Sequence, residues 1–323
     1  MKNNYFSYLK SVAIFFVVGI HLNNFGFNLN IESLNFKLTA LLRLMILPAV
    51  PVFFAISGYF TESSNKKHYD NLKKQIPRIL MPYFIWASIY SIYNLFQGLN
   101  FNKIIFDFFT FQTETPFYFV FLILIYYLIF PLISWFSDSK LKLFIAFLIT
   151  ITTSVMYQYY SKNSNNSLPT IISLGNPCSF FIYPVLGSYI AKNNNIKTSF
   201  LMLLFFLLLS VAESIFLMRS TNNIITSFTT LKPMNVIYCS YLILYIFKFK
   251  NKNIRQTVFS KIGDSSYYIY FSHLFSLIII SKFTHTLNFI QQIILMIIIP
   301  YILYFFMSFF RFLGEKKLKK IGF

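Results

Sequence analysis

The chain has 323 residues, of which 56% are hydrophobic, 21% are aromatic and only 11% are charged. A soluble domain with so few charged side chains could not cover its surface with polar groups, so the composition excludes an ordinary soluble protein and predicts a polytopic membrane protein. The formal net charge of +19 would indicate a nucleic-acid partner in a soluble chain. Cytosolic loops of membrane proteins collect Lys and Arg, however, and we expect the lipid bilayer and no nucleic acid as a partner.

Apolar stretches of membrane-spanning length predict ten transmembrane helices and therefore an all-α bundle. They lie at 7–27, 38–60, 79–97, 116–136, 141–160, 171–191, 198–218, 231–248, 265–282 and 288–311. An even number of spans puts both termini on one side. That side and its loops hold all but seven of the 28 basic residues, which predicts cytosolic termini. We expect residues 1–323 to form a single transmembrane domain with no appended soluble domain.

The first predicted helix carries an ionisable residue, His21, within an apolar run. Lys10 lies eleven residues earlier and shares its helix face, about 16 Å away along the axis. Asn24, three residues after His21, lies on the same side and would orient a ring nitrogen. Ionisable residues at membrane depth usually face a bundle interior or a wet cavity, so a neutral imidazole here is a candidate general base. The alternative is that Lys10 marks the interface and His21 only hydrogen-bonds a neighbouring helix.

Two arginines follow in the next predicted elements. Arg43 lies one to two turns below the outer surface in the second predicted helix, where it would either hold an anion or reach outward to the interface. The loop before the third helix crowds basic residues that include Lys74, and these would attract anionic lipid headgroups or a polyphosphorylated donor. Arg78 lies within a turn of the membrane entry, and its planar guanidinium suits bidentate contacts with phosphate.

Further polar residues lie in the middle and late segments. Phe101 to Phe111 carries two charges among aromatic residues and is expected to be an interfacial or re-entrant piece. Glu213 lies in the outer third of the seventh predicted helix, where an ion pair with Arg219 or Lys232 is the favoured interpretation and a substrate contact the other.

The ninth predicted helix begins near Gly263, with Asp264 or Ser265 as its cap. Ser266, Tyr270 and His273 follow at spacings of four and three and form one polar stripe, which either lines a substrate path or joins helices. Cys178 and Cys239 have no ligand-like spacing, and we expect no metal site.

Four stretches in order resemble the acyltransferase 3 family of bacterial integral-membrane acyltransferases. The chain is similar to the family's opening helix from Tyr8 through Lys10 to His21, and to its second-helix motif at Val50–Tyr59, which contains Ser57-Gly58-Tyr59. It is also similar at Lys74–Tyr83, with Arg78 and Pro82, and at Ile262–His273. The resemblance covers most of the chain.

The resemblance implies transfer of an acyl group, often acetyl, from acyl-CoA to a hydroxyl of a cell-surface or lipid-linked polysaccharide. His21 would be the catalytic residue, and Lys10, Arg78 and Lys74 would bind the donor. Acyl-CoA would be a co-substrate, no cofactor would be tightly bound, and the protein would lie in the bacterial cytoplasmic membrane.

The chain departs from the family pattern at two places. The family has arginine at the position of Lys10, and lysine keeps the charge but loses bidentate phosphate contacts. The entry to the fourth predicted helix, Thr113–Phe119, has neither the histidine nor the tryptophan that is common there, and Glu114 is a candidate substitute. The rival function is a carrier or flippase for lipid-linked glycans that makes no bond, with His21, Arg43 and Glu213 binding the substrate.

Overall fold

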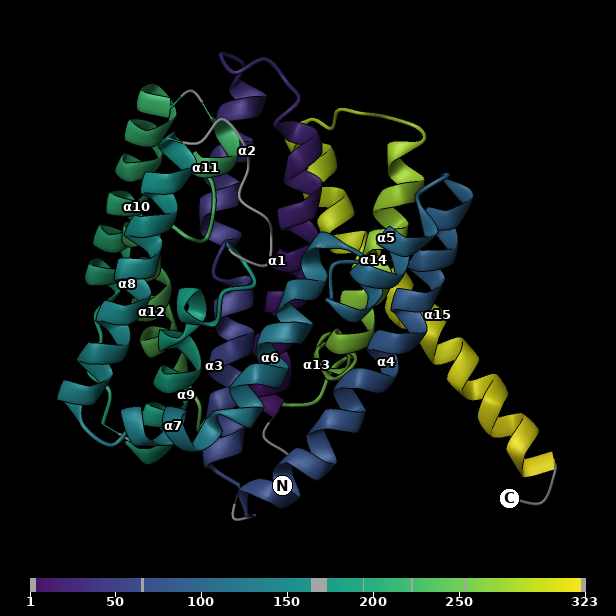
Figure 1. The fold of residues 1–323 in the computed structure, drawn as a ribbon, viewed down its shortest axis with the longest axis horizontal. Helices are drawn as coiled ribbons and strands as arrows, with labels where there is room; N and C mark the ends of the chain where they lie inside the picture. The colour runs from purple at the N-terminus through teal and green to yellow at the C-terminus, as the bar shows by residue number, and fades with distance from the viewer. Residues whose placement is uncertain are drawn as a thin grey trace. The chain divides into compact units, whose positions relative to one another are not determined.

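The computed structural model describes residues 4–64, 67–163, 173–193, 195–221, 223–252 and 254–320, with only the backbone for 162, 163, 225 and 310–320. These residues form helices joined by short turns, and the described part of the chain contains no strand (Figure 1). The predicted all-α architecture is confirmed. Contacts divide the chain into two compact units, Met1–Ala49 with Asn251–Phe323 and Val50–Lys250.

The first unit is built around the N-terminal helix α1, drawn in purple in Figure 1. Its helices are α1 (Asn4–Gly26), α2 (Leu34–Ile46), α13 (Val258–Asp264), α14 (Ser266–Ser281) and α15 (Phe289–Lys320). α1 contacts each of the other four. Residues from the two ends of the chain therefore make one core, and α1 is enclosed on more than one face.

The second unit holds the middle of the chain. Its helices are α3 (Ala49–Glu62), α4 (His68–Phe96), α5 (Phe101–Phe109), η1 (Thr115–Phe117), α6 (Tyr118–Leu128), α7 (Phe130–Phe136), α8 (Lys140–Asn163), η2 (Pro177–Phe180), α9 (Ile182–Lys192), α10 (Phe200–Thr221), α11 (Ile224–Ser227) and α12 (Pro233–Phe247). α4 packs on α5 and α6, whereas α12 packs on α8, α9 and α10.

Glycine lets α3 and α9 meet backbone to backbone. A methyl group at Gly58 would lie 2.1 Å from the carbonyl oxygen of Pro184, and one at Gly187 would lie 2.0 Å from that of Ala55. Any larger side chain would force the helices apart. The Ser57-Gly58-Tyr59 motif thus has a packing role in this unit.

Each predicted span contains helix, but not every helix is long enough to cross a membrane. Six candidate spans among the described residues are long and apolar enough, and one of them comprises α2 and α3 together. They are Asn4–Gly26, Leu34–Glu62 (α2 and α3), His68–Phe96, Lys140–Ser161, Phe200–Thr221 and Phe289–Phe309. A seventh is formed if Thr115–Leu128 and Phe130–Phe136, bent by 75°, count together. Pro131 lacks an N–H group, which accounts for a break at this point.

Three of the ten expected spans are shorter than a span requires. α12 has 15 residues and α14 has 16, which at 1.5 Å per residue gives about 24 Å at most against a hydrocarbon core of about 30 Å. The expected span at 171–191 begins outside the described residues, and its regular part, α9, has 11 residues. The structure therefore supports six or seven full spans by length and composition, with shorter apolar helices among them.

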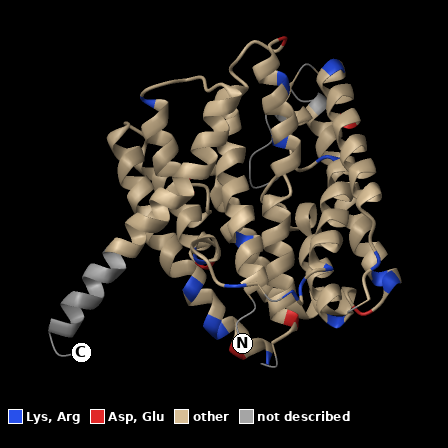
Figure 2. Ribbon diagram, turned by 180° about the vertical axis from the view of Figure 1, so that it is seen from behind, with Lys and Arg blue, Asp and Glu red and all other residues tan. Residues whose placement is uncertain are grey.

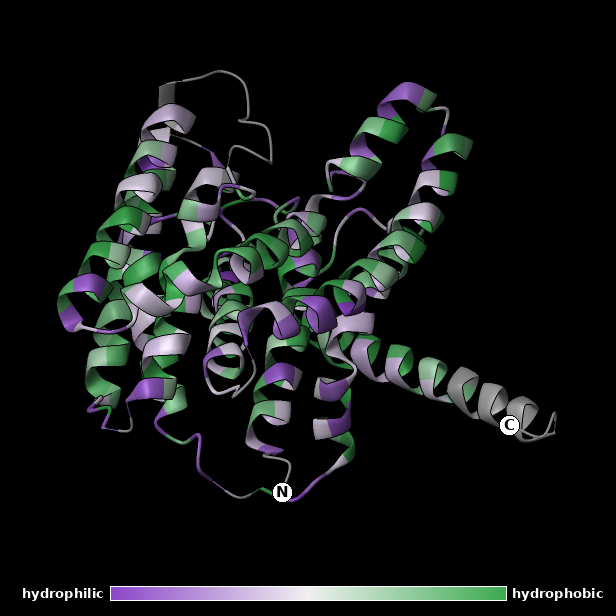
Figure 3. Cartoon of the chain, turned by 60° about the horizontal axis from the view of Figure 1, so that its bottom comes forward, coloured by the Kyte–Doolittle hydropathy of each residue, from purple (hydrophilic) through white to green (hydrophobic). Residues whose placement is uncertain are grey.

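Charge and hydropathy follow the helices in the expected way. Lys and Arg lie mainly near helix ends and turns (Figure 2), while apolar residues cover most of the long helices (Figure 3). One boundary differs from the prediction, because α4 begins at His68 and not near residue 79. Most of the expected basic loop is therefore the first part of a helix.

Candidate functional site

His21 and Lys10 lie on one unbroken helix, α1, as the sequence predicts. Both side chains are half-buried. Because α2, α13, α14 and α15 surround α1, its polar residues meet other protein elements within this unit. The expectation that His21 faces a bundle interior is therefore compatible with how α1 is packed.

The structure brings His21 beside His273 of α14. Their ring centroids are 5.1 Å apart, with an angle of 46° between the ring planes. His273 is fully buried, and its Nδ1 lies 2.5 Å from the carbonyl oxygen of Tyr270. A carbonyl oxygen can only accept, so Nδ1 carries the hydrogen and Nε2 of the neutral ring is an acceptor. That Nε2 is buried and has no hydrogen-bond partner in the described part of the chain.

Arg43 of α2 contacts the part of α1 that carries His21. Its Nη1 donates a hydrogen bond to the carbonyl oxygen of Ile20. The sequence left open whether Arg43 holds an anion or reaches outward to the membrane interface. The side chain is partly buried and binds the backbone of α1, so it does not reach outward. Ile20 directly precedes His21, so the positive charge of the Arg43 guanidinium lies against the backbone next to His21.

Asn23, and not Asn24, is the buried asparagine of this turn. Asn24 is exposed, and within the described residues no hydrogen bond joins it to His21. Asn23 is fully buried and donates to Oε1 of Gln292 at 2.7 Å, and Gln292 donates to Oγ1 of Thr39 at 2.9 Å. Sequence reasoning missed this network between α1, α15 and α2, although polar amides within apolar helices were its available signal.

The polar stripe of α14 is present and buried. Ser266 and Tyr270 both lie below one tenth exposure, and the Tyr270 ring lies 5.8 Å from that of His273. Tyr270 and His273 therefore share one aromatic and polar cluster with His21. Ser266 lies near the start of α14, seven residues before His273.

The start of α14 is capped differently from the prediction. Ser265 occupies the cap position but makes no side-chain capping bond. The carboxylate of Asp264 instead accepts a hydrogen bond of 2.7 Å from Ser7 of α1. Gly263 makes this approach feasible, since a methyl group there would lie 1.8 Å from the Ser7 carbonyl oxygen. The segment thus joins α13 to α1.

Lys74 and Arg78 lie in the second unit, on the first half of α4. Both are exposed. Their spacing of four residues puts them on one face of a continuous helix, where two positive charges can act on the same anion. They belong to a different unit from Lys10.

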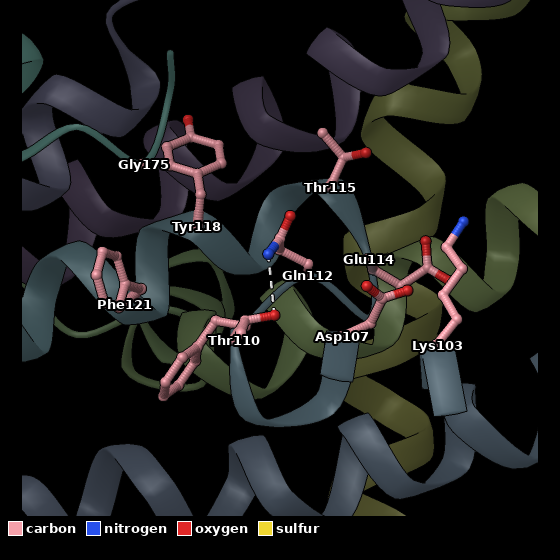
Figure 4. A pocket seen from close by; sticks show the side chains of 10 residues that line it. Lys103, Asp107, Thr110, Gln112, Glu114, Thr115, Tyr118, Phe121 and Gly175 are labelled. Carbon is pink, nitrogen blue, oxygen red and sulfur yellow. Dashed lines mark hydrogen bonds between the residues drawn. The ribbon is translucent and has the colours of Figure 1, made fainter. Parts of the chain in front are cut away.

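Glu114 lines a polar cavity of about 210 Å³ in the second unit (Figure 4). The cavity lies between α5, η1 and α6 and is lined by Lys103, Asp107, Thr110, Phe111, Gln112, Glu114, Thr115, Tyr118, Phe121 and Gly175. Burial raises the pKa of Glu114 to about 7. Sequence reasoning marked Glu114 but not the cavity, because residues from 103 to 175 meet there only after folding.

Glu213 has the ion pair that the sequence favoured. Its Oε2 lies 4.0 Å from Nζ of Lys232, and its carboxylate also accepts from the backbone N–H of Met234. Lys232 is fully buried and donates to the carbonyl oxygen of Ser210 at 3.1 Å. These contacts join α10 to the start of α12, so the pair has a structural explanation.

Among the described residues no three His, Cys, Asp or Glu side chains gather as a metal site would require. Comparison with known families gave one result: a family model for an acyltransferase domain, that of acyltransferase 3, matches residues 3–311. Comparisons with curated proteins and with solved structures gave no match.

Proposed function

The chain belongs to the acyltransferase 3 family, and we propose that it moves an acyl group, with acetyl expected, from acyl-CoA to a hydroxyl of a cell-surface or lipid-linked polysaccharide. Family membership and the apolar helices together make it a multi-pass membrane acyltransferase. The acyl-CoA donor, the glycan acceptor and the roles of individual residues are proposed.

The observation that carries the proposal is the contact between His21 and His273. A general base needs a lone pair at the reacting atom and a fixed ring orientation. Nε2 of His273 is a buried acceptor to which no described residue donates a hydrogen bond. If one ring nitrogen of His21 donates to it, the other nitrogen of His21 carries the lone pair. His21 is then the catalytic residue and His273 a positioning residue.

The transfer step follows from that arrangement. His21 takes the proton from the acceptor hydroxyl as its oxygen attacks the thioester carbonyl carbon. The new C–O bond forms, the C–S bond breaks, and the CoA thiolate receives the proton from the His21 imidazolium. Arg43, whose guanidinium binds the carbonyl oxygen of Ile20, contributes positive charge near the oxyanion that develops during the attack.

Charge supports the assignment of the donor contacts. CoA carries several phosphate groups, and Lys10, Lys74 and Arg78 are each proposed to contact them. The pair at Lys74 and Arg78 shares one helix face, and a guanidinium binds phosphate with two parallel hydrogen bonds. Acyl-CoA is a co-substrate in this scheme and no cofactor is tightly bound. The proposed location is the bacterial cytoplasmic membrane, with both termini in the cytosol.

The proposal is tested by the release of free CoA thiol from acetyl-CoA by purified protein in detergent, with host glycans as acceptor. His21→Ala should lower turnover by about 10² to 10⁴. The matched control is His285→Gln, since His285 is an exposed histidine of the same unit. Full turnover by His21→Ala would remove His21 from the catalytic role.

The same assay separates the enzyme from the rival carrier. A glycan carrier or flippase has no need of acyl-CoA and releases no thiol. Glycan transport by the wild-type protein without thiol release would favour the carrier, and the two histidine variants would then be compared for transport.

A further inference from the structure

The cavity between α5, η1 and α6 is lined by none of the residues to which the transfer step above assigns a role. Its volume of about 210 Å³ is below the range of about 300–1,000 Å³ that is typical for drug-sized ligands. The space therefore suits one small ring and not an extended chain.

The cavity has two chemically different ends (Figure 4). Lys103, Asp107 and Glu114 gather at one end, and the rings of Tyr118 and Phe121 lie at the other. The charged end offers both donors and acceptors of hydrogen bonds. The aromatic end offers flat apolar surface. A ligand that fits has hydroxyl groups at its edge and an apolar face, as a sugar ring has.

The loop between the two ends is held in a costly conformation. Phe111 has φ of 58°, a left-handed conformation that costs roughly 1–2 kcal/mol for a residue with a side chain. Its ring lies 4.4 Å from that of Tyr83 in α4, which holds the loop against that helix. Gln112 donates from its side chain to Thr110 at 2.9 Å. Strain that the surrounding contacts maintain is often found at binding sites.

The charges of the cavity favour a neutral ligand. Two carboxyl groups face a single lysine, so an anion such as a uronic acid meets more negative than positive charge. A metal ion would meet only two carboxyl groups and the repulsion of Lys103. Burial raises the pKa of Glu114 to about 7, so near neutral pH this group both donates and accepts hydrogen bonds, as the hydroxyls of a neutral sugar require.

We propose that this cavity is a sugar-binding site of the second unit, which binds one neutral sugar ring of the acceptor glycan between its charged end and the rings of Tyr118 and Phe121. The identification of the ligand as the acceptor rests on the acyl transfer proposed above. Glu114 and Asp107 hold the ring hydroxyls, and the aromatic end packs against the apolar face.

Saturation-transfer NMR with purified protein tests this without any donor. The neutral probes are the methyl glycosides of glucose, galactose and N-acetylglucosamine, and the anionic probe is methyl glucuronide. At least one neutral probe should bind the wild-type protein and bind at least fivefold more tightly than the glucuronide. Glu114→Gln and Phe121→Ala should each weaken that binding at least fivefold.

The matched control is Glu32→Gln, which changes an exposed carboxylate of the other unit. It should bind as the wild type does, and thermal unfolding should show that all variants fold. Unchanged binding by both cavity variants, or glucuronide binding as tight as that of the neutral probes, would overturn the proposal.

The binding test and the thiol-release test fail independently. His21→Ala should retain glycoside binding, since His21 is not among the residues that line the cavity. Binding that persists in a protein that releases no thiol with any acceptor would contradict the proposed acyl transfer and leave the sugar site in place.

Discussion

Replacement of His273 by leucine should lower kcat by roughly tenfold without destabilising the protein. The His273 Nε2 is buried and has no hydrogen-bond partner among the residues that the structure describes. Such a group costs about 1–3 kcal/mol, which leucine would recover. The change also removes the Nδ1 bond to Tyr270, worth about 0.5–1.5 kcal/mol. The net effect on the free energy of unfolding is therefore close to zero or favourable.

The effect on catalysis has the opposite sign. A hydrogen bond that orients His21 is worth about 1–1.5 kcal/mol, and each 1.36 kcal/mol is tenfold in rate. Such bonds often tighten only in the substrate complex, so the 5.1 Å between ring centroids is compatible with this role.

The assay compares His273→Leu with His273→Gln, because a glutamine amide oxygen can accept a hydrogen bond. We expect kcat to fall in His273→Leu with KM unchanged for both substrates, and to recover in part in His273→Gln. Thermal unfolding is measured in parallel. Activity that falls only in proportion to stability, or equal kcat in the two variants, would refute the positioning role.

Three further predictions concern stability. Burial raises the pKa of Glu114 from 4.5 to about 7, so the folded protein holds more protons in this range and loses stability as pH rises. Glu114→Gln should then gain about 1–3 kcal/mol relative to wild type between about pH 4.5 and pH 8, and a pH-independent difference in melting temperature would contradict this. Gly263→Ala should cost about 3 kcal/mol, because its methyl group would lie 1.8 Å from the Ser7 carbonyl oxygen; a wild-type denaturant midpoint would disprove the close contact. Lys232→Met should cost about 3 kcal/mol by leaving Glu213 unpaired, and adding Glu213→Gln should restore most of it. A double variant no more stable than the single one would exclude the ion pair.

The helical fold could be predicted because long apolar runs can satisfy their backbone groups in a membrane only as helices. All ten predicted segments contain helix, but their ends could not be predicted from hydropathy. α4 extends eleven residues before the expected start, and α6 is separated from α7 by a bend of 75°. Helix ends and bends of this kind depend on local capping and on contacts with other helices, which a hydropathy profile does not describe.

In the candidate site, too, some residues could be identified from the sequence and others only from the folded structure. His21 was identified from its own segment, since a titratable group in an apolar helix is costly wherever the helix lies. Asn24 was considered because it lies near His21, and Asn23 was not considered. Asn23 is buried because α15 packs against the part of α1 that carries it, where it donates to Gln292. Glu114 was marked only by its position in a motif, and the cavity that surrounds it was not foreseen.

The sequence by itself determined that the protein is a helical membrane protein of the acyltransferase 3 family, and it singled out His21 as the candidate general base. These properties reside in composition, in runs of neighbouring residues and in short motifs. Only the tertiary structure decided that His273 lies beside His21, that Arg43 binds the backbone of α1, and that a polar cavity forms around Glu114. Each of these depends on helices that are distant in sequence meeting at one point, and their contacts are selected by packing of the whole unit.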